Sequence, residues 1–112
     1  MAVPNLNRAL VLEAPDRAED GSGGYVETWG VLGTLWAEVK SRTGREQNLS
    51  GVTVSLVSYR ITVRAAPVGS EQRPVAGQRF RDGDRIYAIR AVTEKDSDHR
   101  YLECFADEEV AT

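Results

Sequence analysis

The chain has 112 residues and a mass of 12.3 kDa, which fits one compact domain over residues 1–112. Apolar residues make up 41% and charged residues 28% of it, a balance typical of folded soluble proteins. The net charge of −3 argues against nucleic-acid binding driven by overall charge. The N-terminal residues lack the pattern of a secretory signal, and no apolar run approaches the roughly 20 residues of a membrane span, so we expect no membrane contact.

The periodicity of the chain is that of β-strands. Residues 57–64 alternate apolar and polar side chains without error, so their odd-numbered positions are expected to face a core. The predicted strands, in chain order, are residues 8–13, 25–29 joined to or extending 35–40, 57–64, 79–81, 85–92 and 101–105. The predicted core consists of Leu10, Leu12, Leu35, Val39, Tyr59, Ile61, Val63, Ile89, Leu102 and Cys104. About six short strands indicate an all-β fold, a small antiparallel barrel or sandwich.

Turn residues separate these runs. The glycine-rich residues 20–24 and the Asp-Gly-Asp of residues 82–84 are typical of hairpin turns. Ala66 and Pro67 are predicted to end the preceding strand, residues 68–77 to form a loop, and residues 94–98 a polar turn. Residues 41–55 match neither strand nor helix, and loops of this length are usually functional or disordered. We therefore predict a long loop insertion there.

Charge is unevenly distributed along the chain. Residues 1–39 carry a net charge of −4, residues 40–90 of +6, and residues 91–112 of −5. Twelve of the fourteen basic residues are arginine, which suits interfaces and phosphate contacts. The pattern is compatible with pairing inside the chain, with complementarity between subunits, with a local polyanion contact, or with solvated charge alone.

Signals for enzymatic chemistry or a cofactor are weak. In an extended segment Asp98 points away from both Ser97 and His99, so these three residues cannot form a catalytic relay. His99 and Cys104 are five residues apart and face opposite sides of one regular strand. One histidine and one cysteine do not suffice for a zinc site, and the aspartates do not have calcium-loop spacing. We predict no enzyme, no metal and no cofactor.

A nucleic-acid-binding barrel of the oligonucleotide-binding type is the main alternative. Such barrels combine a basic groove with stacking aromatic side chains. Tyr59, Arg60 and Arg64 share one predicted strand, but the tyrosine faces the apolar side and both arginines face the other. This division weakens the alternative.

Several short motifs, in order from about residue 8 to 109, resemble the phage head–tail joining protein family. These are the small head-closure or stopper proteins of tailed phages and gene transfer agents. The matching segments are residues 8–15, 23–29, 35–39, 44–46 with the sequence Gly-Arg-Glu, 59–64 with the sequence Tyr-Arg-Ile-Thr-Val-Arg, 85–89 and 100–104. Thr43 departs from the family, in which Ser is commoner before Gly-Arg-Glu.

The resemblance implies a β-barrel that assembles into a homo-oligomeric ring, usually a dodecamer, in the connector of a virion or gene transfer agent particle made in the bacterial cytoplasm. Such a ring lies below the portal or adaptor and above the tail terminator or tail tube proteins, and it closes the head around double-stranded DNA. A neighbouring position, as adaptor or terminator, stays open. Uneven charge suits a ring, because one subunit's basic surface can contact the next one's acidic surface.

The resemblance also directs attention to particular residues. Arg42, Gly44, Arg45 and Glu46 fall in the predicted loop and are expected either to line the ring's channel or to contact the neighbouring subunit. The outward-facing Trp36, Arg60 and Arg64 are expected at the ring interface.

Overall fold

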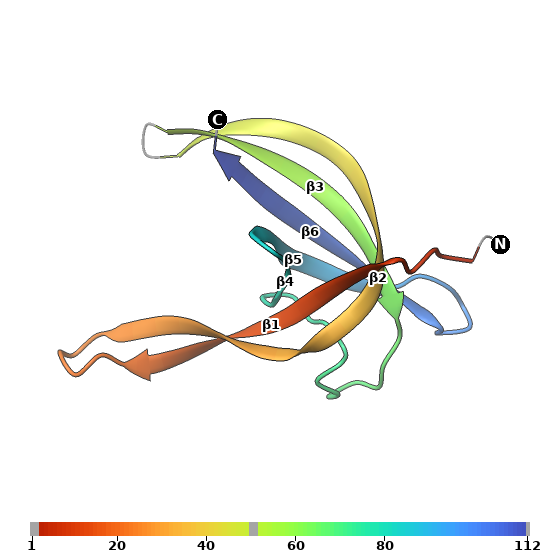
Figure 1. Ribbon diagram of the computed structural model, residues 1–112, viewed down its shortest axis with the longest axis horizontal. Helices are drawn as coiled ribbons and strands as arrows, with labels where there is room; N and C mark the ends of the chain where they lie inside the picture. The colour runs from red at the N-terminus through yellow and green to blue at the C-terminus, as the bar shows by residue number, and fades with distance from the viewer. Residues whose placement is uncertain (1–2, 50–51, 112) are drawn as a thin grey trace.

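A computed structural model describes residues 3–49 and 52–111 and shows an all-β protein (Figure 1). Its six strands are β1 (Arg8–Glu19), β2 (Tyr25–Leu49), β3 (Val52–Arg64), β4 (Arg79–Asp82), β5 (Arg85–Glu94) and β6 (Tyr101–Ala111). The predicted joining of residues 25–29 to 35–40 is confirmed, because both lie in the single strand β2. The described residues form no helix that could cross a membrane.

All six strands belong to one antiparallel sheet that closes on itself, in the order β1-β2-β3-β6-β5-β4. Short pairing between β4 and β1 completes the closure, in the register Leu12 with Phe80. The sheet bends at three irregularities, which lie at Leu12/Glu13, Ser41/Thr43 and Ile89/Ala91. Such bulges increase local bending and twist, which helps a sheet of this size to close. The predicted antiparallel barrel is therefore confirmed.

The core fills the inside of the closed sheet. Its buried apolar residues are Leu10, Leu12, Ala37, Ile61, Val63, Phe80, Tyr87, Ile89, Leu102, Cys104 and Ala106. Seven of the ten predicted core residues are among them, while Leu35, Val39 and Tyr59 are only partly buried against this cluster. The Cys104 thiol is buried as predicted, and this burial raises its pKa to about 12.

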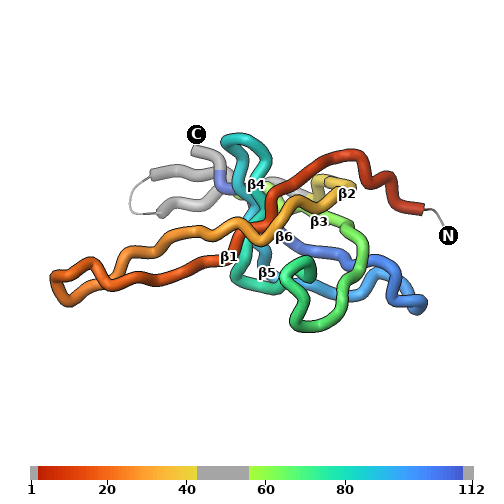
Figure 2. Tube along the Cα trace, turned by 60° about the horizontal axis from the view of Figure 1, so that its bottom comes forward, coloured from red at the N-terminus to blue at the C-terminus, as the bar shows by residue number. Residues whose placement is uncertain are grey.

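A two-stranded ribbon, residues 14–30 of β1 and β2, extends beyond the barrel and is called the arm here (Figures 1 and 2). β4 pairs with β1 only at residues 11–13, and β3 pairs with β2 only from residue 37 onwards, so the arm's strands pair with each other. The radius of gyration is 15.4 Å, above the roughly 13 Å of a compact chain of this length. The extension of the arm accounts for part of this difference.

The turn at the tip of the arm follows the sequence prediction. Gly21 and Gly23 have φ of +82° and +84°, values that L side chains rarely adopt. The Asp20 carboxylate accepts hydrogen bonds from the backbone N–H groups of Ser22, at 2.8 Å, and Gly24, at 3.1 Å. The Asp20 side chain therefore stabilises the turn at the tip.

The predicted long loop over residues 41–55 is wrong for the part that the structure describes. Residues 41–49 continue β2, residues 52–55 begin β3, and the two strands pair up to the register Leu49 with Val52. Ser50 and Gly51, which the same prediction covered, lie outside the described residues. Strands can pair through their backbones without alternating apolar and polar side chains. Residues 41–49 lack this alternation, so the sequence pattern did not identify the hairpin.

Candidate functional site

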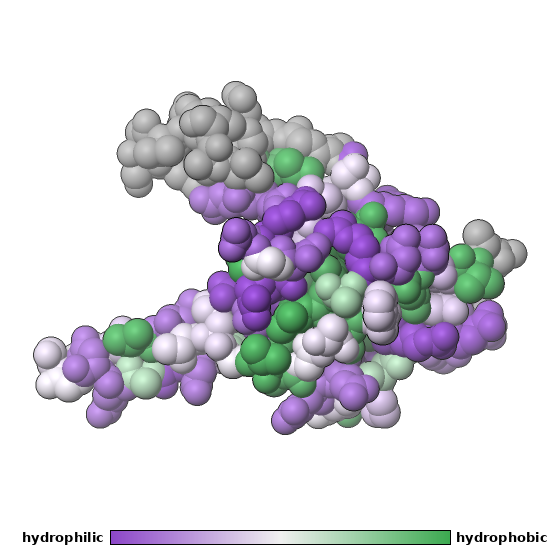
Figure 3. Space-filling model, viewed as in Figure 1, coloured by the Kyte–Doolittle hydropathy of each residue, from purple (hydrophilic) through white to green (hydrophobic). Residues whose placement is uncertain are grey.

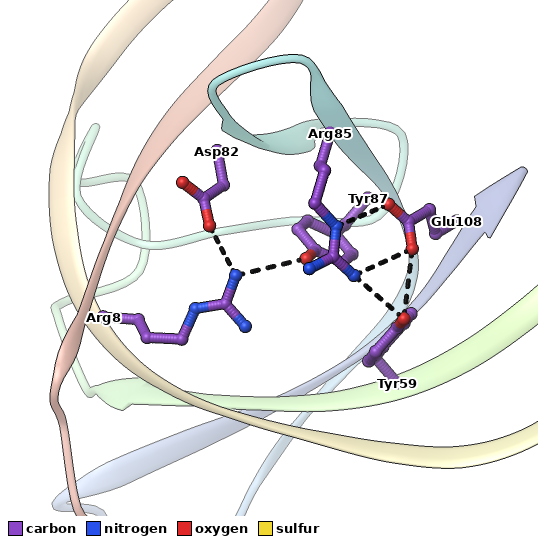
Figure 4. A network of polar contacts seen from close by, with 6 residues as sticks. All are labelled: Arg8, Tyr59, Asp82, Arg85, Tyr87 and Glu108. Carbon is purple, nitrogen blue, oxygen red and sulfur yellow. Dashed lines mark hydrogen bonds and ion pairs between the residues drawn. The ribbon is translucent and has the colours of Figure 1, made fainter. Parts of the chain in front are cut away.

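A network of polar side chains closes one end of the barrel interior (Figure 4). It consists of Arg8 of β1, Tyr59 of β3, Asp82 of β4, Arg85 and Tyr87 of β5, and Glu108 of β6. These positions continue the inward-facing alternation of their strands, beyond the point where the apolar core ends. Five of the six strands therefore contribute to a single cluster.

The centre of the network is the Glu108 carboxylate. Arg85 donates to it from Nε, at 2.8 Å, and from Nη2, at 3.0 Å. The Tyr59 hydroxyl donates to the same carboxylate at 3.0 Å, and accepts a hydrogen bond from Arg85 at 3.0 Å. Arg8 forms an ion pair with Asp82 and reaches the Tyr87 hydroxyl at 3.4 Å. Each charge in the cluster has an opposite charge beside it.

The contacts shift the pKa values of four members of the network, Arg8, Tyr59, Arg85 and Glu108. Hydrogen bonds from Arg85 hold the pKa of Glu108 below its ordinary value, and the same contact raises the pKa of Arg85. Burial, followed by the bond to Glu108, raises the pKa of Tyr59. The hydrogen bond to Asp82 raises the pKa of Arg8. At neutral pH the network therefore holds an ionised Arg85–Glu108 pair beside a neutral Tyr59.

A second cluster lies on the outside of the barrel, where β1 meets β4. Glu13 is only 4% exposed and accepts hydrogen bonds from Arg79 Nε, at 2.7 Å, and Arg81 Nε, at 2.9 Å. The Arg79 guanidinium also lies 4.0 Å from the ring centroid of Trp29. Burial alone would raise the pKa of Glu13, but hydrogen bonds and charge from Arg81 and Arg79 outweigh it and lower the pKa. The cluster fastens the short β4 to β1.

The polar side chains of both clusters bind one another. Among the described residues every buried side-chain nitrogen or oxygen has a hydrogen-bond partner, and no group of three or more potential metal ligands occurs. His99 lies in the exposed turn before β6, beside Glu94, whereas Cys104 is buried in the core. A saturated network of this kind fixes the orientation of the strands that contribute to it.

The uneven charge along the chain is explained largely by pairing within the fold. Basic residues of the middle segment contact acidic residues of the two end segments across neighbouring strands. The pairs are Arg79 and Arg81 with Glu13, Arg85 with Glu108, Arg90 with Asp107, and Arg60 with Glu103. Of the alternatives considered for the sequence, pairing inside the chain thus accounts for much of the basic segment.

The residues expected at a ring interface fall in two places. Trp36 and Arg64 line one open groove of about 290 Å³, called the Trp36–Arg64 groove here. Its other lining residues are Leu6, Thr34, Leu35, Ala65, Ala66 and Gln72. Arg60 is not in the groove, and its Nε lies 3.7 Å from the Glu103 carboxylate on the outer face of β3 and β6. The structure brings two of the three residues together.

The residues expected to line a channel or contact a neighbour all lie in β2. Arg42 is exposed and its guanidinium lies 4.9 Å from the ring centroid of Phe105. Gly44, Arg45 and Glu46 pair through their backbones with Val57, Leu56 and Ser55 of β3. The side chains of Arg45 and Glu46 lie outside the described part of the structure.

Sequence reasoning missed two features. Tyr87 and Glu108 were not identified as buried members of the polar network, because Tyr87 lies in a run that is apolar on both faces and Glu108 lies in an acidic segment. The arm was missed because its turn was recognised but not the length of its strands. Residues 26–30 do not alternate regularly between apolar and polar side chains, so they do not indicate a strand of that length.

Comparison with known proteins identifies the family. The model of the phage head completion protein family matches residues 1–109. A chain in a solved structure of the virion of a native gene transfer agent (GTA) particle superimposes with a TM-score of 0.89, and its sequence is 49% identical. The match covers 98% of this chain and 100% of that chain. No curated protein matches the sequence. The chain therefore belongs to the family of phage head completion proteins, and it is a structural protein of the virion.

Proposed function

We propose that the chain is a head-closure, or stopper, protein that forms a homo-oligomeric ring, with twelve copies as the expected number. In this position the ring lies below the portal or adaptor, closes the DNA-filled head and docks the tail terminator or tail tube. The observation that carries the proposal is the end-to-end match to a chain of a gene transfer agent virion, at 49% identity. Membership of the head completion family supports it.

The geometry is suited to such a role. The barrel is a closed sheet whose interior is filled by the apolar core and the polar network, so it forms a rigid body. From this body the β1–β2 arm and the hairpin of residues 41–49 and 52–58 extend outward (Figure 1). A rigid body with projecting hairpins can contact partners above, below and beside it in a ring.

The hairpin of residues 41–49 and 52–58 has two possible roles in this ring. Arg45 and its neighbour Arg42, repeated around an axis, would present many positive charges to DNA in a central channel. Alternatively, Arg45 and Glu46 pair with charged residues of the next subunit. Both roles follow from the proposed ring, and a charge substitution distinguishes them.

The test of the proposed function is genetic removal of the chain followed by electron microscopy of the particles. Without the chain, we expect fully assembled heads that lack tails and lose their DNA. Tailed particles should form again when the chain is supplied from a plasmid. Cryo-electron microscopy of the restored particles should show a ring of this barrel directly below the portal or adaptor. Tailed, DNA-filled particles in normal numbers without the chain would overturn the proposal.

A further inference from the structure

The arm carries apolar side chains that the described part of the chain does not cover. Tyr25 and Val26 are 61% and 50% exposed, and Figure 3 shows apolar groups among polar ones along the arm. The Arg17 guanidinium lies 5.1 Å from the ring centroid of Tyr25 but leaves most of that ring exposed. An isolated two-stranded ribbon is only marginally stable in water. A preformed ribbon with exposed aromatic and aliphatic groups is therefore well suited to bind another surface.

The Trp36–Arg64 groove is a complementary surface on the barrel. Trp36 is 60% exposed and, with Leu6 and Leu35, forms apolar walls around about 290 Å³, enough for a side chain of the size of tyrosine. Arg64 is exposed at the edge of this groove, and within residues 3–49 and 52–111 no hydrogen bond or ion pair holds its guanidinium. The groove thus combines an apolar floor with one available positive charge.

The charge of the arm is opposite to that of the groove. Residues 14–30 contain four acidic side chains, Asp16, Glu19, Asp20 and Glu27, and only one basic side chain, Arg17. Glu19 lies directly across from Tyr25 in the register of the ribbon, so an aromatic ring and a carboxylate stand side by side near the tip. This pair matches the combination of Trp36 and Arg64 in the groove.

The arm and the groove lie on opposite sides of the molecule. The tip of the arm marks one end of the long axis, whose extent is 51 Å, whereas β3 ends and the segment before β1 runs on the other side (Figure 1). The arm therefore cannot enter the groove of its own chain. Two different and complementary patches on opposite sides of one chain are what a head-to-tail ring contact requires.

We propose that the tip of the arm of one subunit docks into the Trp36–Arg64 groove of the next copy of this chain, with Tyr25 in the groove and Glu19 beside Arg64. This inference rests on the proposed function, because it describes the joint between neighbours in the proposed ring. Repetition of one such joint around an axis links all copies without a second kind of contact.

Cysteine cross-linking within particles tests the joint directly. The variant Ser22→Cys with Gln72→Cys places one thiol at the arm tip and one in the groove, and it leaves Tyr25 and Arg64 in place. Native Cys104 is buried and its pKa is about 12, so it contributes little background. We expect oxidation to produce a ladder of covalent oligomers of this chain. The control pair Ser22→Cys with Ser97→Cys, in the turn before β6, should stay monomeric.

A charge exchange tests the proposed ion pair. Arg64→Glu and Glu19→Arg, each alone, should lower incorporation of the chain into particles by about tenfold, and the double variant should restore it. The matched control is Arg90→Glu, which reverses an exposed arginine of β5 that pairs with Asp107 in its own chain. Circular dichroism should show the same folded barrel for all four variants.

The outcomes separate this inference from the proposed function. Tailed particles that contain the chain, but show no cross-link between positions 22 and 72 and tolerate Arg64→Glu, would overturn the arm-in-groove joint and leave the ring intact. A cross-link from position 22 to a different virion protein would overturn the joint in favour of an adaptor or tail contact. Absence of the chain from tailed particles would overturn both.

Discussion

Arg85, at the start of β5, and Glu108, near the end of β6, form a two-pronged ion pair inside the barrel wall, with separations of 2.8 Å and 3.0 Å. The same carboxylate accepts a hydrogen bond from Tyr59 of β3. One acidic side chain thus links three neighbouring strands at the end where the apolar core stops. This end of the barrel is stabilised by paired charges, whereas the rest of the barrel interior is stabilised by burial of apolar side chains.

Replacement of Glu108 should reveal this dependence as a function of pH. Its pKa in the folded protein is lower than the 4.5 of a free glutamate, so its contribution is complete above pH 4.5 and is lost as the pH falls through the lower folded value. Glu108→Gln should therefore lower the free energy of unfolding at pH 7 by about 1–2 kcal/mol, and by progressively less below pH 4.5. Urea denaturation at several pH values measures this difference.

The control for this experiment is Glu109→Gln, one residue along β6, where the side chain is exposed. It should change the free energy of unfolding by less than about 0.5 kcal/mol at any pH. A Glu108→Gln variant with the same pH profile as the wild type would contradict the assigned role of the network.

A substitution in the apolar core should change the free energy of unfolding in a way that does not depend on pH. Ile61 is fully buried on β3, so Ile61→Ala should lower the free energy of unfolding by about 2–5 kcal/mol, through lost burial and a cavity. Val68, in the loop after β3, is 87% exposed, and Val68→Ala should cost less than about 0.5 kcal/mol. Equal urea midpoints for the two variants would refute the placement of Ile61.

The parts of the fold that the sequence predicted are those in which side-chain burial alternates. Ile61 and Val63 were assigned to the core because polar residues stand between them, and both are buried. The prediction that Thr62 points outward from the same strand was also correct. Thr62 is nevertheless only 3% exposed, because Glu38 and Glu103 flank it on the neighbouring strands. Alternation indicates direction, whereas burial depends on the neighbours that the sheet supplies.

The parts that the sequence did not predict depend on pairing or on long-range contact. Phe80 is buried, but it lies in a strand of four residues between arginines and an aspartate, too short for a period to be recognised. Arg8 and Asp82 are 74 residues apart, and their ion pair exists only because β1 and β4 close the barrel. Contacts of this kind require the register of the whole sheet.

The arm allows a prediction about local order. Asp20→Ala removes the carboxylate that binds the backbone N–H groups of Ser22 and Gly24 at the tip. We expect faster amide hydrogen exchange in residues 21–25 and an unchanged melting temperature, because the tip makes no contact with the core in the described structure. Glu27→Ala, on the adjacent strand of the arm, should leave exchange at the tip unchanged. A lower melting temperature for Asp20→Ala would mean that the arm supports the barrel.

Substitution of Arg45 distinguishes the two roles of the hairpin that contains it. If Arg45 contacts the next subunit, Arg45→Glu should prevent assembly of the ring, and an acidic-to-arginine change in the facing surface should restore it. If Arg45 lines the channel, rings and tailed particles should form in normal numbers, but the heads should lose DNA, because many repeated positive charges near one axis become negative. Electron microscopy counts tailed particles, and nuclease-resistant DNA per particle measures retention. Arg45→Glu particles that assemble, keep their DNA and deliver it at the normal level would exclude both roles, and the hairpin would then carry only solvated charge.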